Sequence, residues 1–248
     1  MRDVFIFDVD GTLTPAREKI NPYFSDFLLN FMKHHETYLA SGSDLDKLKQ
    51  QLPKEAFEAS SGIFTCMGNV YYCNGKQQYK RSFEAPEGLI EDLVSILNES
   101  PYTYKFGNHI EKRIGMINFS VVGRNANSEQ RKQYHKYDEE KNEREKIASL
   151  LNSKYAGQIV AAVGGEISID IYNPGRDKSQ VLTELVKCGN IRRNDCIHFY
   201  GDKIFPGGND HALGQALEKS GYNCRIVRVN TWIDTWKRLF LTHYSIVK

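Results

Sequence analysis

The chain has 248 residues, and its 33 Lys and Arg residues against 31 Asp and Glu residues leave a formal charge of +2. Chains of this length often divide into two domains, and the balanced charge predicts neither a nucleic-acid partner nor an anionic membrane partner. The five cysteines form no CxxC pair, and no stretch has the roughly 20 consecutive apolar residues that span a bilayer. We therefore expect a cytoplasmic protein with no membrane association.

The two ends of the chain show the alternation of strands and helices that is typical of a doubly wound parallel sheet. The first strand is a continuous apolar run, as expected for a strand buried on both faces. In chain order the expected elements are a strand over 4–7, a helix over 21–33, a strand over 37–40, a helix over 45–51, a helix over 178–187 and strands over 196–200 and 225–229.

The middle of the chain has a different pattern. Residues 116–122 and 166–172 alternate apolar and polar residues, which predicts antiparallel strands with one buried and one open face. In the second of these strands Ser168 and Asp170 fall on the open face, and a charged helical stretch over 129–155 lies between the two strands. We predict an α/β fold whose sheet domain is interrupted by an α+β insert. The expected parts are a first core segment over 1–83, the insert over 84–174 and a second core segment over 175–248.

Two carboxylates, Asp8 and Asp10, follow the first strand directly. Open α/β sheets bind their ligands at the carboxyl ends of parallel strands. Because like charges that are buried together need a cation, the pair implies a divalent metal ion. The pair also suits phosphoryl transfer, in which one Asp attacks phosphorus and the other handles the proton. On these residues alone a structural alternative stays open, in which the carboxylates only accept backbone N–H bonds of the loop.

Further motifs in the same order make the chain resemble the haloacid dehalogenase (HAD) superfamily of phosphoryl-transfer enzymes. These motifs are Ser41-Gly42-Ser43, Asp177-Lys178, Tyr200-Gly201-Asp202 and Gly207-Gly208-Asn209-Asp210. The resemblance implies that Ser41 contacts the transferring phosphoryl group and that Lys178 neutralises the nucleophile and the phosphate. It also implies a magnesium site with all-oxygen ligands. Its expected ligands are the side chains of Asp8, Asp202 and Asp210 and the carbonyl of Asp10.

Over nearly the whole chain the sequence is similar to the eukaryotic-type phosphomannomutases, which are HAD enzymes with an inserted α+β cap. The similarity rests on the opening motif over 8–17, on 113–124 with Arg131 seven residues later, on 164–170 and on 205–210. It implies that cap arginines bind a phosphate through forked, bidentate donors while polar side chains contact sugar hydroxyls. The implied substrate-binding residues are Arg17 in the core and Arg113, Arg124, Arg131, Ser168 and Asp170 in the cap.

This resemblance implies a phosphomannomutase that interconverts mannose 6-phosphate and mannose 1-phosphate, with glucose phosphates as further expected substrates. Asp8 would form an aspartyl phosphate, and Asp10 would donate and accept the proton. The implied cofactors are Mg²⁺ and a hexose 1,6-bisphosphate of glucose or mannose as activator. The implied partners are small-molecule hexose phosphates and a second copy of the chain, bound through the cap. The implied role is in mannose metabolism and GDP-mannose biosynthesis.

Two alternatives stay open. In a HAD sugar-phosphate phosphatase, water rather than sugar accepts the phosphoryl group, and a third possibility is a catalytically weak sugar-phosphate-binding protein. Arg176 stands where the resembling family usually has Trp, and Cys66-Met67-Gly68-Asn69 replaces a usual Glu-Asn-Gly. These departures leave the sugar preference and the balance between mutase and phosphatase open. Away from these motifs, His198 is interpreted as a core histidine, and Trp232 and Trp236 as one core-facing side of a helix.

Overall fold

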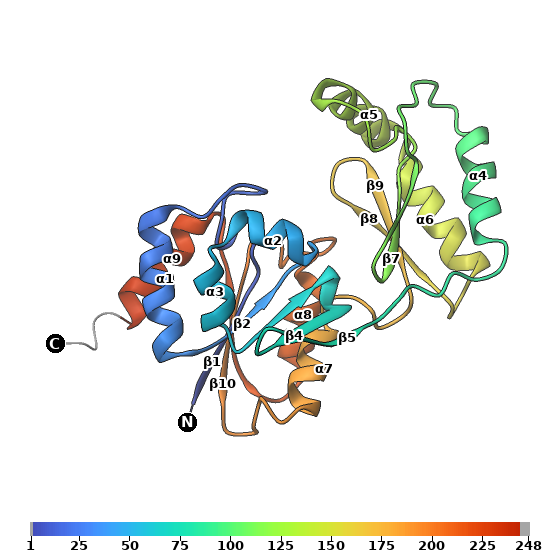
Figure 1. The fold of residues 1–248 in the computed structure, drawn as a ribbon. Helices are drawn as coiled ribbons and strands as arrows, with labels where there is room; N and C mark the ends of the chain where they lie inside the picture. The colour runs from blue at the N-terminus through green and yellow to red at the C-terminus, as the bar shows by residue number, and fades with distance from the viewer. Residues whose placement is uncertain (1, 244–248) are drawn as a thin grey trace. The chain divides into compact units, whose positions relative to one another are not determined.

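The computed structural model describes residues 2–243, which form two compact units (Figure 1). The first unit combines Met1–Lys80 with Asp177–Lys248, and the second is Arg81–Arg176. The sequence led us to expect the insert over 84–174. Among the described residues no helix combines the length and the apolar character needed to cross a bilayer.

The first unit is built on a seven-stranded sheet with the order β11-β10-β1-β2-β3-β4-β5. The first five strands in this order are parallel, and the last two continue the sheet as antiparallel neighbours. The parallel strands are β11 (Asn223–Arg228), β10 (Cys196–Gly201), β1 (Asp3–Phe7), β2 (Glu36–Ala40) and β3 (Gly62–Thr65). The antiparallel strands are β4 (Val70–Cys73) and β5 (Lys76–Lys80). The predicted doubly wound parallel core is confirmed.

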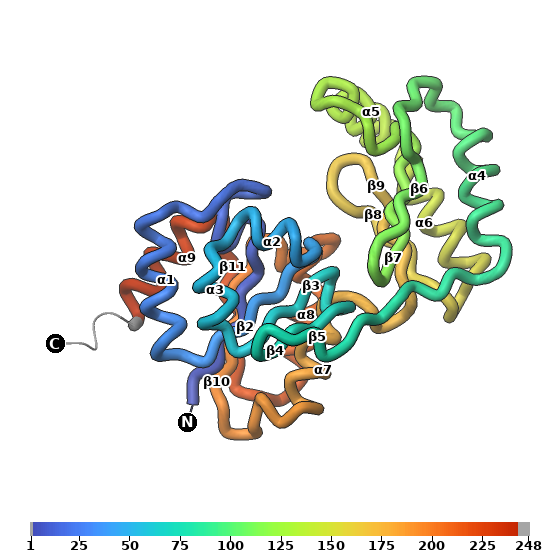
Figure 2. Tube along the Cα trace, viewed as in Figure 1, coloured from blue at the N-terminus to red at the C-terminus, as the bar shows by residue number. Residues whose placement is uncertain are grey.

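Helices cover both faces of this sheet, as the trace in Figure 2 shows. One face packs against α1 (Pro22–His34), α2 (Leu45–Gln51), α3 (Lys54–Ala59) and α9 (Trp232–His243), and the other against α7 (Gln180–Lys187) and α8 (His211–Lys219). β1 supplies both cores because alternate side chains point to opposite faces. Phe5 and Phe7 lie on the α1 face, and Val4 and Ile6 lie on the α7 face.

The helical predictions at both ends of the chain are confirmed. Asn21 caps α1 by accepting hydrogen bonds from the Tyr23 and Phe24 backbone N–H groups, and Pro22 stands at the first helical position. In α9, Trp232 and Trp236 stack on Phe24 with ring centroids 5.9 and 5.5 Å apart. These aromatic contacts join the first and last helices of the chain on one face of the sheet.

The second unit is a four-stranded antiparallel sheet with the order β6-β7-β9-β8 and three helices. Its strands are β6 (Ile110–Arg113), β7 (Met116–Phe119), β8 (Val160–Gly164) and β9 (Ser168–Tyr172), and its helices are α4 (Leu89–Glu99), α5 (Ser128–Lys141) and α6 (Glu143–Lys154). Ile117, Phe119, Ile169 and Ile171 point from the sheet into a core shared with these helices. The opposite sheet face carries the polar side chains described below.

Some boundaries in this unit differ from the predictions. β7 ends at Phe119 rather than 122, and β9 begins at Ser168 rather than 166. The charged stretch over 129–155 forms two helices, because Asn142 between them takes a left-handed conformation with a φ of 51°. Asn tolerates this conformation better than most residues. The break allows the Asp138 and Glu143 side chains on either side of it to be buried.

Candidate active site

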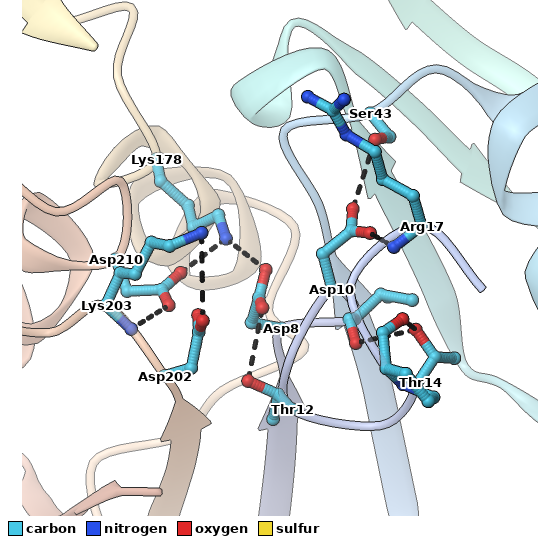
Figure 3. Close-up of polar contacts among 12 residues, drawn as sticks. Asp8, Asp10, Thr12, Thr14, Arg17, Ser43, Lys178, Asp202, Lys203 and Asp210 are labelled. Carbon is cyan, nitrogen blue, oxygen red and sulfur yellow. Dashed lines mark hydrogen bonds and ion pairs between the residues drawn. The ribbon is translucent and has the colours of Figure 1, made fainter. Parts of the chain in front are cut away.

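Three carboxylates from two neighbouring strands meet at the carboxyl end of the central sheet (Figure 3). Asp8 directly follows β1, and Asp202 and Asp210 lie in the segment after β10, which pairs with β1 in parallel. The Asp8 backbone N–H donates to the Tyr200 carbonyl at 2.9 Å, which ties the first loop to the neighbouring strand. One oxygen from each of the three carboxylates lies within 4.8 Å of the others. The parallel register therefore gathers acids that are far apart in the sequence.

Lys178 lies between two of these carboxylates and has no exposed surface. Its Nζ donates to Asp8 Oδ1 at 2.7 Å and to Asp210 Oδ1 at 2.5 Å. Asp177 helps to position it, since the Asp177 carboxylate accepts the Ser179 backbone N–H at 2.8 Å in the turn before α7. Burial disfavours the charged ammonium, but the negative charges of Asp210 and Asp8 outweigh that effect and raise the pKa of Lys178. The lysine is therefore a fixed positive charge inside the site.

The lysine does not fully compensate the acids around it. The three carboxylates carry three formal negative charges against two positive ones, those of Lys178 and of Lys203, whose Nζ lies 3.7 Å from Asp202 Oδ2. Burial together with the charge of Asp210 raises the pKa of Asp8 to about 7. Burial likewise raises the pKa of Asp202. Among the residues that the structure describes, Asp202 Oδ1 is buried without a hydrogen-bond partner. The charge deficit, the unpaired oxygen and the all-oxygen donor set together fit a hard divalent cation such as Mg²⁺.

Gly11 allows the first loop to approach these acids closely. Its φ is +84°, and a Cβ added at this position would lie 2.5 Å from Asp202 Oδ2. Any side chain there would push against the carboxylate and strain the backbone. The loop around it is closed by hydrogen bonds from the N–H groups of Thr12, Leu13 and Thr14 to the Val9 carbonyl. The Thr12 hydroxyl then donates to Asp8 Oδ2 at 3.1 Å, so both oxygens of Asp8 have a donor.

Asp10 belongs to a separate group of contacts, visible to one side of Asp8 in Figure 3. Its Oδ1 accepts the Arg17 backbone N–H and the Gln51 side-chain amide, each at 2.8 Å. Its Oδ2 accepts the Ser43 hydroxyl at 3.2 Å. These three donors orient the Asp10 carboxylate away from the lysine. Because its contacts differ so much from those of Asp8, the two acids suit different chemical roles.

The remaining predicted core residues, Ser41 and Arg17, occupy two different settings. Ser41 is 1% exposed, and its Oγ accepts the Ser43 backbone N–H at 3.0 Å, which shapes the turn after β2. Arg17 is exposed and has a φ of 64°, so its backbone, rather than its guanidinium, makes the contact to Asp10. The Arg17 guanidinium is thus available to a ligand.

Four of the five predicted binding residues of the second unit gather at the polar face of its sheet, where Ser168 is nevertheless buried. Glu111, Asn118, Asp170 and Ala162 form one row across the four strands, because each is the register partner of the next. The Asn118 amide donates to Asp170 Oδ1 at 2.5 Å. Burial raises the pKa of Asp170, and a hydrogen bond from Asn118 and the charges of two nearby arginines oppose that effect. The predicted orientation of Ser168 and Asp170 away from the apolar face is confirmed by this register.

Two arginines meet Glu111 on the same face. Arg113 donates to Glu111 Oε2 through its Nε at 3.0 Å and through Nη2, and Arg124 Nε lies 3.3 Å from the same oxygen. Arg124 also donates from Nη1 to the Ser168 hydroxyl at 2.9 Å. A carboxylate that holds two guanidinium groups together occupies the kind of position that a phosphate would occupy. Arg113, Arg124, Ser168 and Asp170 are therefore brought into one site.

Arg131 has a different environment from the other two arginines. Its Nε donates to the Ala126 carbonyl at 2.8 Å, and its Nη2 donates to the Arg124 carbonyl at 3.0 Å. Arg131 thus supports the loop that carries Arg124. The predicted phosphate contact of Arg131 itself stays a prediction.

A buried ion pair supports the turn of the hairpin formed by β8 and β9. Arg144 Nε donates to Asp138 Oδ2 at 2.8 Å, and both residues are buried. The Arg144 Nη1 donates to the Gly165 carbonyl at 2.8 Å, in the turn between β8 and β9. The pair therefore ties the helical layer to the edge of the polar sheet face.

Sequence reasoning missed several residues that complete these groups. Gln51 lies 41 residues from Asp10, in a helix with no motif of its own, and only the folded chain brings them together. Asn118 lies in the alternating stretch over 116–122, whose polar positions were the available signal, whereas Glu111 lies in β6, which was not predicted. Thr12 and Ser43 lie inside motifs that were already recognised, and their hydroxyls were the available signal there.

The amino-acid sequence matches one family of known proteins over most of its length. Residues 24–238 match the profile of the eukaryotic phosphomannomutase family. The phosphomannomutase of Dendrobium officinale is 34% identical over 226 residues, which cover 88% of this chain and 87% of that protein. The phosphomannomutase of Schizosaccharomyces pombe is 34% identical over 222 residues, which cover 86% of this chain and 85% of that protein. The chain belongs to the eukaryotic phosphomannomutase family.

Solved structures agree with this family at the level of the fold. The C-terminal domain of Candida albicans trehalose-6-phosphate phosphatase superposes with a TM-score of 0.64 at 16% identity, covering 97% of this chain and 91% of that chain. A haloacid dehalogenase-like hydrolase from Bacteroides thetaiotaomicron gives a TM-score of 0.60 at 15% identity, covering 97% of this chain and 100% of that chain. These similarities show a HAD-like fold.

Proposed function

We propose that this member of the phosphomannomutase family interconverts mannose 6-phosphate and mannose 1-phosphate. The observation that carries the proposal is the different setting of the two acids after β1. Asp8 is buried beside a lysine and two further carboxylates, whereas Asp10 is held by the Arg17 backbone N–H and two side-chain donors. Two carboxylates in such different environments suit a nucleophile and a proton carrier.

In this mechanism a carboxylate oxygen of Asp8 attacks the phosphorus atom and forms an aspartyl phosphate, while the bond from phosphorus to the sugar oxygen breaks. Asp10 donates a proton to that departing oxygen and later removes one from the hydroxyl that accepts the phosphoryl group. Lys178 supplies a fixed positive charge beside the nucleophile. Asp8, Asp202 and Asp210 would hold Mg²⁺, which when bound would neutralise charge on the phosphoryl oxygens. Ser41 is proposed to contact the same phosphoryl group.

The polar face of the cap is proposed to bind the phosphate that does not react. Arg113 and Arg124 already share one carboxylate oxygen of Glu111, so a phosphate that replaces this carboxylate finds two guanidinium donors in place. Arg131 is proposed to act in the same phosphate site, Ser168 and Asp170 to contact sugar hydroxyls, and Arg17 to contact the sugar phosphate. A hexose 1,6-bisphosphate is the proposed activator, because it can phosphorylate Asp8 and leave a monophosphate behind.

One assay distinguishes this function from the alternatives. Mannose 1-phosphate is incubated with Mg²⁺, with and without catalytic glucose 1,6-bisphosphate. Mannose 6-phosphate that forms only with the bisphosphate supports the mutase. Inorganic phosphate without isomerisation replaces the mutase with a sugar-phosphate phosphatase, and binding without either product indicates a binding protein. Running glucose 1-phosphate in parallel measures the sugar preference.

Two substitutions test the assigned roles. Asp8→Asn keeps the size of the side chain but removes the nucleophile, so we expect turnover to fall by on the order of 10⁴-fold or more. Turnover that persists in this variant contradicts the covalent mechanism. Arg124→Ala removes one charge-assisted contact to phosphate, worth about 1.5–3 kcal/mol, and should raise KM roughly 10–100-fold. Lys132→Ala, an exposed cation in α5 of the same unit, is the matched control with unchanged KM.

The expected assembly and compartment stay predictions. A homodimer formed through the cap predicts twice the chain mass in light scattering, and a monomer at assay concentrations contradicts it. The cytoplasmic location is tested by fractionation of cells.

A further inference from the structure

A second group of metal-ligating side chains lies at the amino-terminal end of the central sheet. Asp3 begins β1, and Cys196 and His198 lie in β10. Asp3 pairs with Cys196 and Phe5 pairs with His198, so all four side chains point to the same face of the sheet. Asp3 lies five residues before Asp8, which at about 3.3 Å per residue is on the order of 16 Å along the strand. This group is therefore separate from the candidate active site.

The three polar side chains are already close to metal-binding geometry. One ligand atom from each of Asp3, Cys196 and His198 lies within 4.8 Å of the other two, and Asp3 Oδ1 is 2.7 Å from His198 Nε2. A tetrahedral zinc ion with bonds of about 2.0–2.3 Å places its ligand atoms roughly 3.3–3.8 Å apart. Only small side-chain movements separate the two arrangements. The His198 ring stacks on Phe5 with centroids 4.5 Å apart, which fixes the direction of the ring.

The donor chemistry differs from that of the carboxylate cluster. One sulfur, one nitrogen and one oxygen suit Zn²⁺, whereas Mg²⁺ prefers oxygen alone. A thiolate and a carboxylate together balance the charge of a divalent ion. This balance matters because Cys196 and His198 are only 3% and 4% exposed, and an uncompensated charge is costly when it is buried. The Asp3 side chain is 47% exposed and gives an ion access from solvent. Of the three side chains, His198 alone lines an open cavity of about 130 Å³, which has room for water and is also lined by Arg225 and Arg238.

We propose that Asp3, Cys196 and His198 form a second metal site, which binds Zn²⁺ through oxygen, sulfur and nitrogen with water as the fourth ligand. On binding, the Cys196 thiol releases its proton to solvent, and His198 Nε2 exchanges its hydrogen bond with Asp3 for a bond to the metal. No electron is transferred. Without the metal the Asp3 hydrogen bond satisfies His198, so the interpretation as a core histidine describes the metal-free state. The site does not depend on the proposed mutase activity.

Cobalt spectroscopy on the full chain tests this site. Excess Mg²⁺ first saturates the carboxylate cluster, and Co²⁺ is then added as a coloured substitute for Zn²⁺. We expect one Co²⁺ per chain with a near-ultraviolet thiolate-to-cobalt charge-transfer band, which added Zn²⁺ removes. Cys196→Ser should abolish the band, and Asp3→Asn should weaken Zn²⁺ binding by about 10–100-fold or more. Cys224→Ser is the matched control and should keep the band, because Cys224 pairs with Ile197 and points to the opposite face.

Several outcomes overturn the proposal. A wild-type chain that gives no charge-transfer band, or a band that survives Cys196→Ser, shows that Cys196 is not a ligand. Because Cys196 is buried, its variant can fail to fold, and the half-exposed Asp3 then decides. Zn²⁺ affinity that is the same in Asp3→Asn and in the wild type leaves only a structural hydrogen bond between Asp3 and His198.

Discussion

Replacing Lys178 with methionine tests whether the buried ammonium holds the carboxylate cluster together. Methionine has a similar length and removes only the charge and its hydrogen bonds. Lys178 is fully buried and donates to Asp8 at 2.7 Å and to Asp210 at 2.5 Å, and both of these acids are buried as well. The substitution therefore leaves two buried carboxylates without their cation.

The expected cost follows from this burial. Removing one partner of a buried ion pair costs about 3–5 kcal/mol, whereas the whole free energy of unfolding of a domain is typically about 5–15 kcal/mol. The cost should depend on pH. The pKa of Asp8 is about 7 against an ordinary value of 3.8, so its protonation stabilises the fold, and that stability is lost as the pH rises through the folded pKa. Since Lys178 lowers this pKa, its removal widens the range in which Asp8 is protonated. The variant should therefore be closest to the wild type in acid.

The assay is urea unfolding of wild type and Lys178→Met at about pH 5 and about pH 8, with a chelator present to keep divalent ions away. Lys187→Met is the control, in the helix that follows Lys178, because its side chain is 73% exposed and its Nζ lies 3.9 Å from Glu184 Oε1. The control should lose no more than about 1 kcal/mol. A Lys178→Met variant that stays within about 1 kcal/mol of the wild type at both pH values refutes the reasoning, as does a loss that is equal at both. Folding in acid but not at neutral pH supports it.

Two further substitutions test other parts of the structure. Arg144→Met leaves the buried Asp138 carboxylate without its partner, and we expect the free energy of unfolding to fall by about 3–5 kcal/mol, measured by urea denaturation; a loss below about 1 kcal/mol contradicts the inferred burial of the pair. Gly11→Ala strains a backbone φ of +84° and crowds Asp202. We expect the free energy of unfolding to fall by about 1–2 kcal/mol and Mg²⁺ binding, measured by calorimetry, to weaken. Unchanged Mg²⁺ binding shows that Asp202 can move freely.

The sequence was most informative where the structural signal is local. The apolar run before Asp8 predicted a buried strand, and the acids that directly follow this strand predicted a ligand site at the strand's carboxyl end. Both signals are local, because they depend on residues that are neighbours in the sequence. The alternation around Asp170 likewise predicted which side chains point away from the apolar core, although Ser168 on the polar face is buried. The break at Asn142 was missed, since its left-handed conformation depends on two helices packing separately on the sheet.

What the sequence could not provide were the contacts between distant segments. Gln51 reaches Asp10 across 41 residues. Glu111 meets Arg124 because the chain after β7 returns beside β6, where the Arg124 backbone N–H donates to the Asn108 carbonyl. Such contacts depend on strand order and on the direction of each side chain, which periodicity alone does not contain.

By itself the sequence determined a parallel core at the two ends of the chain, its interruption by an α+β insert and the acidic motif after the first strand, because hydrophobic periodicity and turn chemistry act over a few residues. Only the tertiary structure decided that Lys178 pairs with Asp8 across 170 residues, and that Asp3 faces Cys196 and His198. Both groups of contacts join segments that are far apart in the sequence. Parallel pairing of β1 with β10 brings Asp8 near Asp202 and Asp210 at one end of the sheet and Asp3 near Cys196 and His198 at the other, and the segment before α7 adds Lys178 to the acids.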